Sequence, residues 1–302
     1  MSRLLAVLSL LLLSFPSSVL ACACGCGVFE VQTGGMLPNK PGGVAFLEYD
    51  ETNQNKNWAG ARRASDDANG DKRIRTDYVT AGVQYMLSRR WGWRVELPYW
   101  NRRFVKASDA DGTIGTFDHG SVGDIRVRGV YTGLSEDMST GLTFGLKLPT
   151  GDFENPNFDR DTEIGTGSTD LLLGAYKMGV LVPRVGWFAS AQYDQPVLTA
   201  AGYRPGAEVG AAAGVYYDAF RPGGVLLAPL AQAIASNRWS DSGTASTSQA
   251  SGYRRLLLGP GFEAASGRWR ADVSAGFPVW QFTNGNQLVA SEFYRAAVSW
   301  TF

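Results

Sequence analysis

A single histidine limits the catalytic chemistry that this chain could perform. Any mechanism that needs an imidazole must use His119, and Ser121 follows it at a spacing that places both side chains on one face of a strand. A serine hydroxyl becomes a nucleophile when a base accepts its proton and a third group orients that base. No third group is evident, since residues 132–134 read Thr-Gly-Leu. We therefore expect no enzyme activity and no cofactor, and we interpret His119 as a rim residue at the start of a strand.

Three cysteines form a second candidate site, and they stand together near the N-terminus as Cys22, Cys24 and Cys26. The rest of the chain has none, so no disulfide can cross-link the body of the fold. Three thiolates on one glycine-flanked tail are fewer ligands than a closed structural metal site normally uses. Cys24 and Cys26 are therefore weak candidates for metal binding, and a redox-labile or locally disulfide-bonded tail is the alternative.

Acidic loops give weaker indications of cation binding. Asp159, Asp161 and Glu163 could hold a divalent cation loosely, but solvated loop charge is the simpler interpretation. The segment from Asp67 to Asp71 starts like a calcium-binding loop, but Lys72 stands where that loop needs glycine, which excludes an EF-hand.

The N-terminus has the features of an export signal. Arg3 supplies the positive charge, Leu4 to Phe15 form an apolar run, and Ala21-Cys22-Ala23 is a small-residue cleavage site. We predict a signal peptide over residues 1–21, with cleavage at residue 23 as the alternative. Residues 19–22 also resemble a bacterial lipobox loosely, which would make Cys22 a lipid-bearing N-terminus.

Composition excludes two classes of protein. The chain has 302 residues with 28 basic and 28 acidic side chains, so no cationic excess exists to attract nucleic acid. After the signal peptide no stretch of roughly 18 apolar residues occurs, which excludes a polytopic helical membrane protein. The 37 glycines, the 12% share of aromatic residues and the 19% share of charged residues favour many turns and amphipathic strands.

The body of the chain follows a period of two. Over residues 267–282, the odd positions from Trp269 to Val279 are apolar, while the even positions from Arg268 to Gly276 carry charged, polar or small residues. One strand of this kind fits a soluble sandwich as well as a membrane barrel. The number of strands and the lengths of their connections distinguish the two.

About twelve strands are predicted from this alternation and from the turn residues between them. Tight turns and longer polar loops alternate along the chain, which is typical of outer-membrane barrels with periplasmic turns, external loops and periplasmic termini. We predict an all-β fold in which a cysteine- and glycine-containing periplasmic segment, residues 22–42, precedes a single antiparallel transmembrane β-barrel, residues 43–302. The predicted strands lie near residues 43–52, 75–88, 91–106, 119–134, 139–152, 166–182, 184–198, 206–220, 223–238, 251–265, 267–282 and 289–302.

Aromatic residues give an independent indication of a barrel, because Trp and Tyr prefer the membrane interface. One girdle lies beside the predicted periplasmic turns, and a thinner belt lies near the opposite strand ends. The chain ends on Val298, Trp300 and Phe302 at alternating positions, which resembles the C-terminal membrane-targeting strand of bacterial outer-membrane barrels. The girdle consists of Tyr85, Trp91, Trp93, Tyr131, Trp187, Tyr217, Trp269 and Trp300, and the belt of Tyr49, Tyr99, Tyr193 and Phe277.

Several segments resemble a group of bacterial exported proteins. Residues 24–31 read Cys-Gly-Cys-Gly-Val-Phe-Glu-Val, and the most specific segment, residues 148–152, reads Leu-Pro-Thr-Gly-Asp. It is followed by Asn157 to Asp161 and by Gly165 to Asp170. Proteins of this group are usually labelled transporters and are placed beside the outer-membrane proteins of the meta-pathway of phenol degradation. The resemblance implies a β-barrel with a permeation role.

A second resemblance keeps an enzymatic alternative open. His119-Gly-Ser121 is similar to the His-x-Ser of outer-membrane phospholipase A, and strand parity predicts that both side chains face outward near the external rim, where lipid would be met. The resemblance would imply a lipid hydrolase. The asparagine that completes the phospholipase motif has no match here.

The predicted function is that of a porin-like transporter for passive uptake or export of a small molecule. The expected partners are outer-membrane lipid, the barrel-assembly machinery and a small-molecule permeant, and nucleic acid is not expected. About twelve strands leave a narrow or partly plugged lumen. Charges on its wall could select permeants by sign, or could simply pair in a closed structural barrel with a cysteine-based metal or redox tail. By parity these charges are Arg94, Glu96, Asp124, Arg126, Arg128, Lys147, Glu263, Arg268, Arg270, Asp272 and Arg295.

Overall fold

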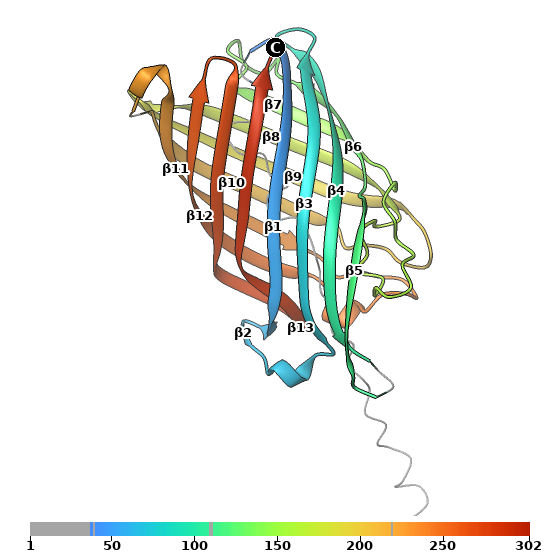
Figure 1. Ribbon diagram of the computed structural model, residues 1–302. Coiled ribbons are helices and arrows are strands. Elements are labelled where there is room, and N and C mark those ends of the chain that lie inside the picture. The colour runs from blue at the N-terminus through green and yellow to red at the C-terminus, as the bar shows by residue number, and fades with distance from the viewer. Residues whose placement is uncertain (1–36, 39, 109–110, 219) are drawn as a thin grey trace, which may run out of the picture.

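The described residues form one closed antiparallel β-barrel (Figure 1). The computed structural model describes residues 37–38, 40–108, 111–218 and 220–302. The predicted signal peptide, the lipidation predicted at Cys22 and the metal or redox role considered for Cys24 and Cys26 lie outside these residues. Within them, no helix is long and apolar enough to cross a membrane.

Neighbouring strands in the chain are mostly neighbours in the sheet. The order runs from β13 back to β1, and β13 also pairs with β1, which closes the ring. β2 pairs with the last residues of β1, and β5 pairs with β4 beside the main path. The strands are β1 (Gly42–Gly60), β2 (Arg62–Arg63), β3 (Asp71–Met86), β4 (Trp91–Ala107), β5 (Ile114–Val122), β6 (Arg126–Tyr131), β7 (Thr140–Lys147), β8 (Ser168–Val182), β9 (Val185–Thr199), β10 (Glu208–Tyr217), β11 (Leu226–Arg238), β12 (Tyr253–Ser266) and β13 (Trp269–Thr301).

β13 contributes two arms to the ring. The first arm pairs with β12 and the second pairs with β1. The chain reverses at Gly285, whose φ of 67° is a conformation that favours glycine. The arms lie side by side, since the Thr301 N–H donates to the Arg268 carbonyl at 2.9 Å. Because β13 therefore crosses the barrel twice, the prediction of an antiparallel barrel of about twelve strands is confirmed.

One predicted strand is broken in two. Residues 119–134 were expected to be continuous, but β5 ends at Val122 and β6 begins at Arg126. Both pieces pair with β4, at different ends of it. Odd-numbered side chains face inward on β5, whereas even-numbered ones face inward on β6. The irregular residues 123–125 therefore switch the inward-facing side chains from odd-numbered positions on β5 to even-numbered positions on β6.

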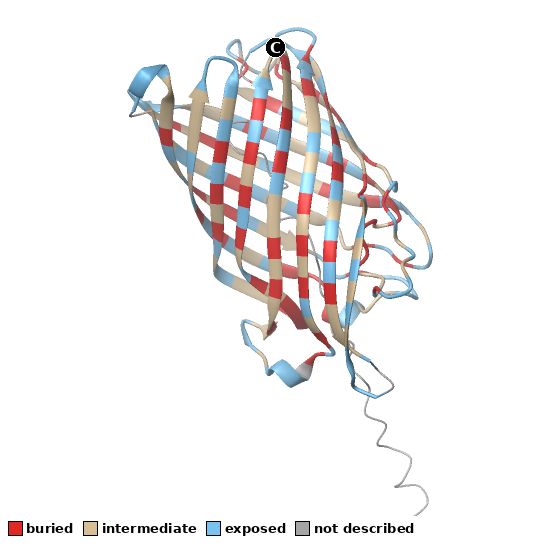
Figure 2. Cartoon of the chain, in the orientation of Figure 1, coloured by how far each residue is buried: buried red, intermediate tan, exposed pale blue. Residues whose placement is uncertain are grey.

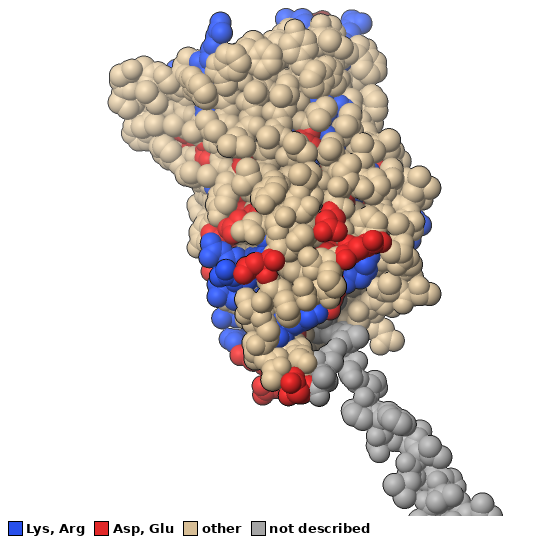
Figure 3. All heavy atoms as spheres, turned by 45° about the vertical axis from the view of Figure 1, so that its right-hand side comes forward, with Lys and Arg blue, Asp and Glu red and all other residues tan. Residues whose placement is uncertain are grey.

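Buried and exposed residues alternate along the strands (Figure 2). The exposed positions include large apolar side chains on many strands, such as Leu47, Leu97, Leu171 and Val273. Figure 3 shows an uncharged belt over most of one face, with charged side chains gathered toward the end opposite the C-terminus. Exposed apolar side chains on many strands of a closed barrel form the kind of surface that a bilayer covers.

The aromatic residues predicted for the girdle gather beside the tight turns. The rings of Trp91 and Tyr131 lie 4.6 Å apart, and those of Trp300 and Phe302 lie 5.1 Å apart. Phe302 also links the C-terminus to the first strand, since its N–H donates to the Gly43 carbonyl at 2.9 Å. Tyr131 and Trp187 are half-buried. Exposed side chains are Tyr85, Trp91, Trp93, Tyr217, Trp269, Val298, Trp300 and Phe302.

Candidate functional site

The long loop between β7 and β8, residues 148–167, covers part of the inner wall of the barrel. The ring of Phe158 lies 5.6 Å from that of Phe104, and both pack in one buried cluster with Leu288. Arg102, which also points inward from β4, donates to the Glu163 carbonyl at 3.2 Å. These contacts hold the loop against the inward faces of β4 and β13, so it narrows the lumen at the end with the longer loops.

The Leu-Pro-Thr-Gly-Asp segment fixes the base of this loop. Asp124 accepts hydrogen bonds from the N–H of Gly151 at 3.0 Å and from the N–H of Thr166 at 2.9 Å, which ties the two ends of the loop together. Gly151 and Gly165 also touch directly, because a Cβ on Gly165 would lie 2.2 Å from the Gly151 carbonyl oxygen. The motif that carries the family resemblance therefore needs its glycines for a close backbone approach.

His119 faces this loop. Its Nε2 lies 3.0 Å from Asp152 Oδ2, and its ring lies 5.8 Å from that of Phe158. The prediction that His119 and Ser121 face outward toward lipid is wrong, because the break after β5 reverses the parity on which it depended. Asp152 is a partner that sequence reasoning did not find. The contact joins the loop to the wall, and it removes the positional argument for a lipid hydrolase.

A charged wall, defined as Glu48, Arg94, Glu96, Arg128 and Arg295, lines one side of the lumen. Arg94 Nη2 donates to Glu96 Oε1 at 2.7 Å, and Arg128 also pairs with Glu96. Arg295 Nη2 lies 2.8 Å from Glu48 Oε2. All five residues are buried, and they come from β1, β4, β6 and β13. Each ion pair between strands satisfies charges that burial alone would penalise strongly.

The charges predicted to face the lumen fall into three groups. Arg268 departs from the prediction, because it lies exposed in the tight turn between β12 and β13. Arg126, Glu263 and Arg270 are half-buried on strands. The buried ones are Arg94, Glu96, Asp124, Arg128, Lys147, Asp272 and Arg295.

Several inward-facing acids were missed in the sequence. Glu48 and Asp50 on β1, Asp170 on β8 and Asp194 on β9 all line the lumen cavity, and the period of two could have found them. The prediction that Glu163 is a solvated loop charge is wrong. The residue is only 7% exposed, because its loop folds into the barrel.

Burial shifts the pKa values of two loop side chains. Desolvation raises the pKa of Glu163 from 4.5 to about 7, because the carboxylate loses contact with water. Desolvation likewise lowers the pKa of Arg160. The Arg160 guanidinium lies 4.5 Å from the ring centre of Tyr203 and 5.0 Å from that of Phe153. These stacking contacts hold the side chain between the two rings.

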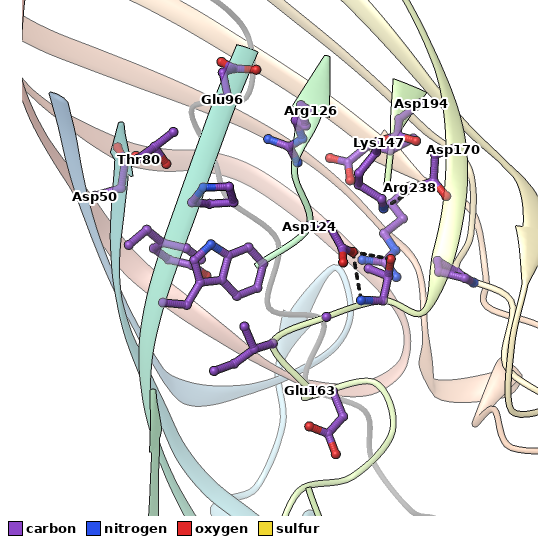
Figure 4. A pocket seen from close by; sticks show the side chains of 18 of the residues that line it. Asp50, Thr80, Glu96, Asp124, Arg126, Lys147, Glu163, Asp170, Asp194 and Arg238 are labelled. Atoms are coloured by element: carbon purple, nitrogen blue, oxygen red, sulfur yellow. Dashed lines mark hydrogen bonds and ion pairs between the residues drawn. The ribbon is translucent and has the colours of Figure 1, made fainter. Parts of the chain in front are cut away.

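A cavity of about 130 Å³ lies between the charged wall and the loop. In Figure 4, Asp50 stands on one side, Asp170 and Asp194 stand on the opposite side, and Glu163 lies at the edge. Nine carboxylates and six cationic side chains line this cavity. The carboxylates are Glu48, Asp50, Glu96, Asp124, Asp161, Glu163, Asp170, Asp194 and Glu208, and the cations are Arg94, Arg126, Lys147, Arg160, Arg238 and Arg295.

An apolar patch lines another part of the lumen. Leu37 packs against it and is 4% exposed, and the Tyr176 hydroxyl donates to the Pro38 carbonyl at 3.4 Å. Leu37 and Pro38, near the end of the segment predicted over residues 22–42, therefore lie inside the barrel, whereas Lys40 is exposed. The patch consists of Tyr176, Phe188, Ala212, Ile234, Leu257, Ala290 and Phe293.

Metal ligation finds no support in the described part of the chain, where no three or more His, Cys, Asp or Glu side chains are grouped to hold an ion. Asp159, one of the loop acids considered for cation binding, accepts from Lys106 Nζ at 2.9 Å.

The chain matches no protein-family model, and no curated protein matches its sequence. Its fold is similar to that of an outer membrane channel from Pseudomonas putida F1, with a TM-score of 0.68 and 15% identity over 90% of this chain and 100% of that one. It is also similar to the beta domain of the Bordetella autotransporter BrkA, with a TM-score of 0.52 and 11% identity over 87% of this chain and 100% of that one. At these identities the likeness shows the fold, which is that of an outer-membrane β-barrel.

Proposed function

We propose that the protein is an outer-membrane channel through which a small molecule passes passively. The observation that carries this proposal is a cavity inside a closed barrel, lined by charged side chains and bordered by a loop whose base is tied to Asp124. A polar cavity enclosed by a belt of exposed apolar residues suits passage of a solute across a bilayer. The resemblance to transporters beside the meta-pathway of phenol degradation supports the same role.

Single-channel recording in planar bilayers tests the proposal directly. We expect discrete conductance steps from the purified protein and a reversal potential that shifts when salt differs across the bilayer. Asp272→Asn should change the ion selectivity while the protein still folds, because Asp272 is buried on the inner wall. Glu136→Gln is the matched control, since Glu136 is exposed in the turn between β6 and β7. No conductance from well-folded protein would refute the channel.

A closed structural barrel is the second candidate, and the ion pairs of the charged wall favour it. Glu96 and Glu48 each have arginine partners within the wall, so these charges need no permeant. Liposome swelling separates the two candidates, because a channel admits small solutes and a closed barrel does not. Swelling no faster than that of protein-free liposomes would favour the structural barrel.

We further propose that the barrel resides in the outer membrane and is inserted by the barrel-assembly machinery through its C-terminal strand. The exposed Val298, Trp300 and Phe302 on that strand support this assignment. The protein should fractionate with the outer membrane and migrate faster on gels before boiling than after, because closed barrels resist detergent. Recovery in the soluble periplasm with heat-independent migration would contradict the location.

A further inference from the structure

Basic side chains gather at the end of the barrel that carries the C-terminus. Five connections join neighbouring strands there, and four of them carry exposed arginines: those between β3 and β4, β8 and β9, β10 and β11, and β12 and β13. Figure 3 shows Lys and Arg side chains projecting from this end. Two exposed lysines, one before β1 and one on β8, lie nearby. The basic turn surface consists of Arg89, Arg90, Arg184, Arg221, Arg268, Lys40 and Lys177.

The cations of the basic turn surface have no acidic partners. None of the seven forms an ion pair with a carboxylate in the part of the chain that the structure describes. The acids at this end are fewer, namely Glu136, Asp137, Asp218 and the C-terminal carboxylate. A cluster of exposed cations with an unmatched charge attracts an anionic partner.

Three exposed or half-buried arginines at the opposite end differ in this respect. Arg103 Nε lies 2.7 Å from Asp118 Oδ1, and Arg75 Nη2 lies 3.2 Å from Glu51 Oε1. Arg63 is likewise paired with the acid three residues after it. Because their charges are already matched, these three arginines are suitable controls for the unpaired ones.

The aromatic girdle places the basic turn surface at the depth of lipid headgroups. Arg90 directly precedes Trp91, and Arg268 directly precedes Trp269. Trp side chains on the outside of a barrel prefer the interface between hydrocarbon and water. A basic residue next to such a ring, on the side of the turn, therefore lies where the phosphate groups of a bilayer are found.

Lys177 indicates that the partner is lipid. It lies on the same outward face of β8 as Leu171 and Leu173, which are 38% and 44% exposed. A lysine at the edge of a lipid-facing surface buries its aliphatic stem and extends its charged end to the headgroups. A water-soluble acidic partner would not reach a side chain on this face once the bilayer surrounds the barrel.

We propose that the basic turn surface binds the phosphate groups of anionic phospholipids in the adjoining leaflet, an inference that rests on the proposed membrane location. Guanidinium groups suit this ligand, because their N–H donors match two phosphate oxygens at once. The surface favours anionic over zwitterionic lipid, because only the anionic headgroup has a net charge that attracts the basic side chains.

Quenching of tryptophan fluorescence by brominated lipids measures this preference on the full protein in vesicles. Five of the nine tryptophans belong to the girdle, so they report on lipids beside the basic turn surface. Brominated phosphatidylglycerol competes with phosphatidylcholine, and the quenching gives their relative binding constant. We expect a preference of roughly fivefold for phosphatidylglycerol at low salt. High salt should reduce it, because exposed charges are screened.

Two triple variants locate the preference. Replacement of Arg90, Arg184 and Arg268 by Gln should reduce it to about twofold or less, since each side chain is exposed and unpaired. Replacement of Arg63, Arg75 and Arg103 by Gln is the matched control and should leave the preference unchanged. Both variants remove the same charge, so an effect of total charge would appear in both. Faster migration of unboiled protein confirms that each variant is folded.

The outcomes separate this inference from the proposed function. Equal quenching by the two lipids, a preference that high salt leaves unchanged, or equal losses in the two triple variants would each overturn the lipid surface. Retention of the protein by purified peptidoglycan, lost in the turn variant while both lipids quench equally, would assign the cations to the cell wall instead. A preference that depends on the turn arginines supports the inference even when bilayers show no conductance, in which case only the channel fails. A protein that conducts without any preference leaves the channel standing.

Discussion

The charged wall and the apolar patch line the same lumen, but different contacts stabilise them. Each acid of the charged wall is paired with arginines from its own or neighbouring strands, so the partners of this region lie within the wall itself. The apolar patch needs no hydrogen bonds, and Leu37 covers it from a segment before the first strand. Substitutions in the two regions should therefore destabilise the barrel for different reasons. In the charged wall they leave a buried charge unpaired, and in the apolar patch they remove packing contacts.

The largest effect is expected in the charged wall. Glu96→Gln leaves the buried Arg94 and Arg128 facing a neutral amide, and removing one partner of a buried ion pair typically costs about 3–5 kcal/mol. The free energy of unfolding in urea, followed by tryptophan fluorescence in lipid vesicles, measures the loss. Glu136→Gln is the exposed control and should stay within about 0.5 kcal/mol of the parent. Equal midpoints for the two variants would show that the wall is not held by its ion pairs.

The outer face of the first arm of β13 should give the next largest effect. Val273 is 54% exposed and Asp272 is 9% exposed, so the two neighbours lie on opposite faces of the barrel wall. Val273→Arg places a charge in the apolar belt and should destabilise the inserted barrel by roughly 2–4 kcal/mol. Asp272→Asn should insert normally. Folding yield into vesicles compares them, and normal insertion of Val273→Arg beside blocked insertion of Asp272→Asn would mean that the register is inverted.

A smaller loss is expected at the apolar patch. Leu37→Ala removes buried methyl groups from the cluster that includes Tyr176 and Phe293, and it should reduce the free energy of unfolding by about 2 kcal/mol. Lys40→Ala, at an exposed position of the same segment, is the control. Unfolding curves in urea give both values. If the two substitutions had the same effect, packing of Leu37 against the patch would contribute nothing to stability.

The smallest effect is expected in the loop over residues 148–167, and it depends on pH. Because burial raises the pKa of Glu163 from 4.5 to about 7, the folded chain binds a proton that the unfolded chain has released. The contribution of the protonated carboxyl to loop docking is therefore fully present below pH 4.5 and is lost as the pH rises through 7. Amide hydrogen exchange in residues 148–167, corrected for intrinsic rates, should show weaker protection at pH 8 than at pH 5. Glu163→Gln should abolish that difference, and a difference that persists would place the titration elsewhere.

The architecture of the barrel was accessible from the sequence because its signals are local. Alternation along residues 267–282 separated Val273 from Asp272, and the turn residues marked most strand ends. The same period of two correctly predicted that most of the charged residues, including Arg94 and Arg295, face the lumen. A strand in a membrane barrel has lipid on one side and the lumen on the other, so apolar residues indicate the lipid face and charged residues indicate the lumen face.

The site depended on contacts between segments far apart in the chain. Asp124 interrupts a strand because its carboxylate binds both ends of the loop at Gly151 and Thr166, and this interruption reversed the expected orientation of His119. No local pattern shows that a loop folds inward, so the sequence predicted a solvated Glu163 although the side chain is buried in the fold. The sequence by itself determined which strands form and which face of most strands meets lipid. Only the tertiary structure decided which loop and which N-terminal residues occupy the lumen, because those positions depend on packing and hydrogen bonds that sequence periodicity does not encode.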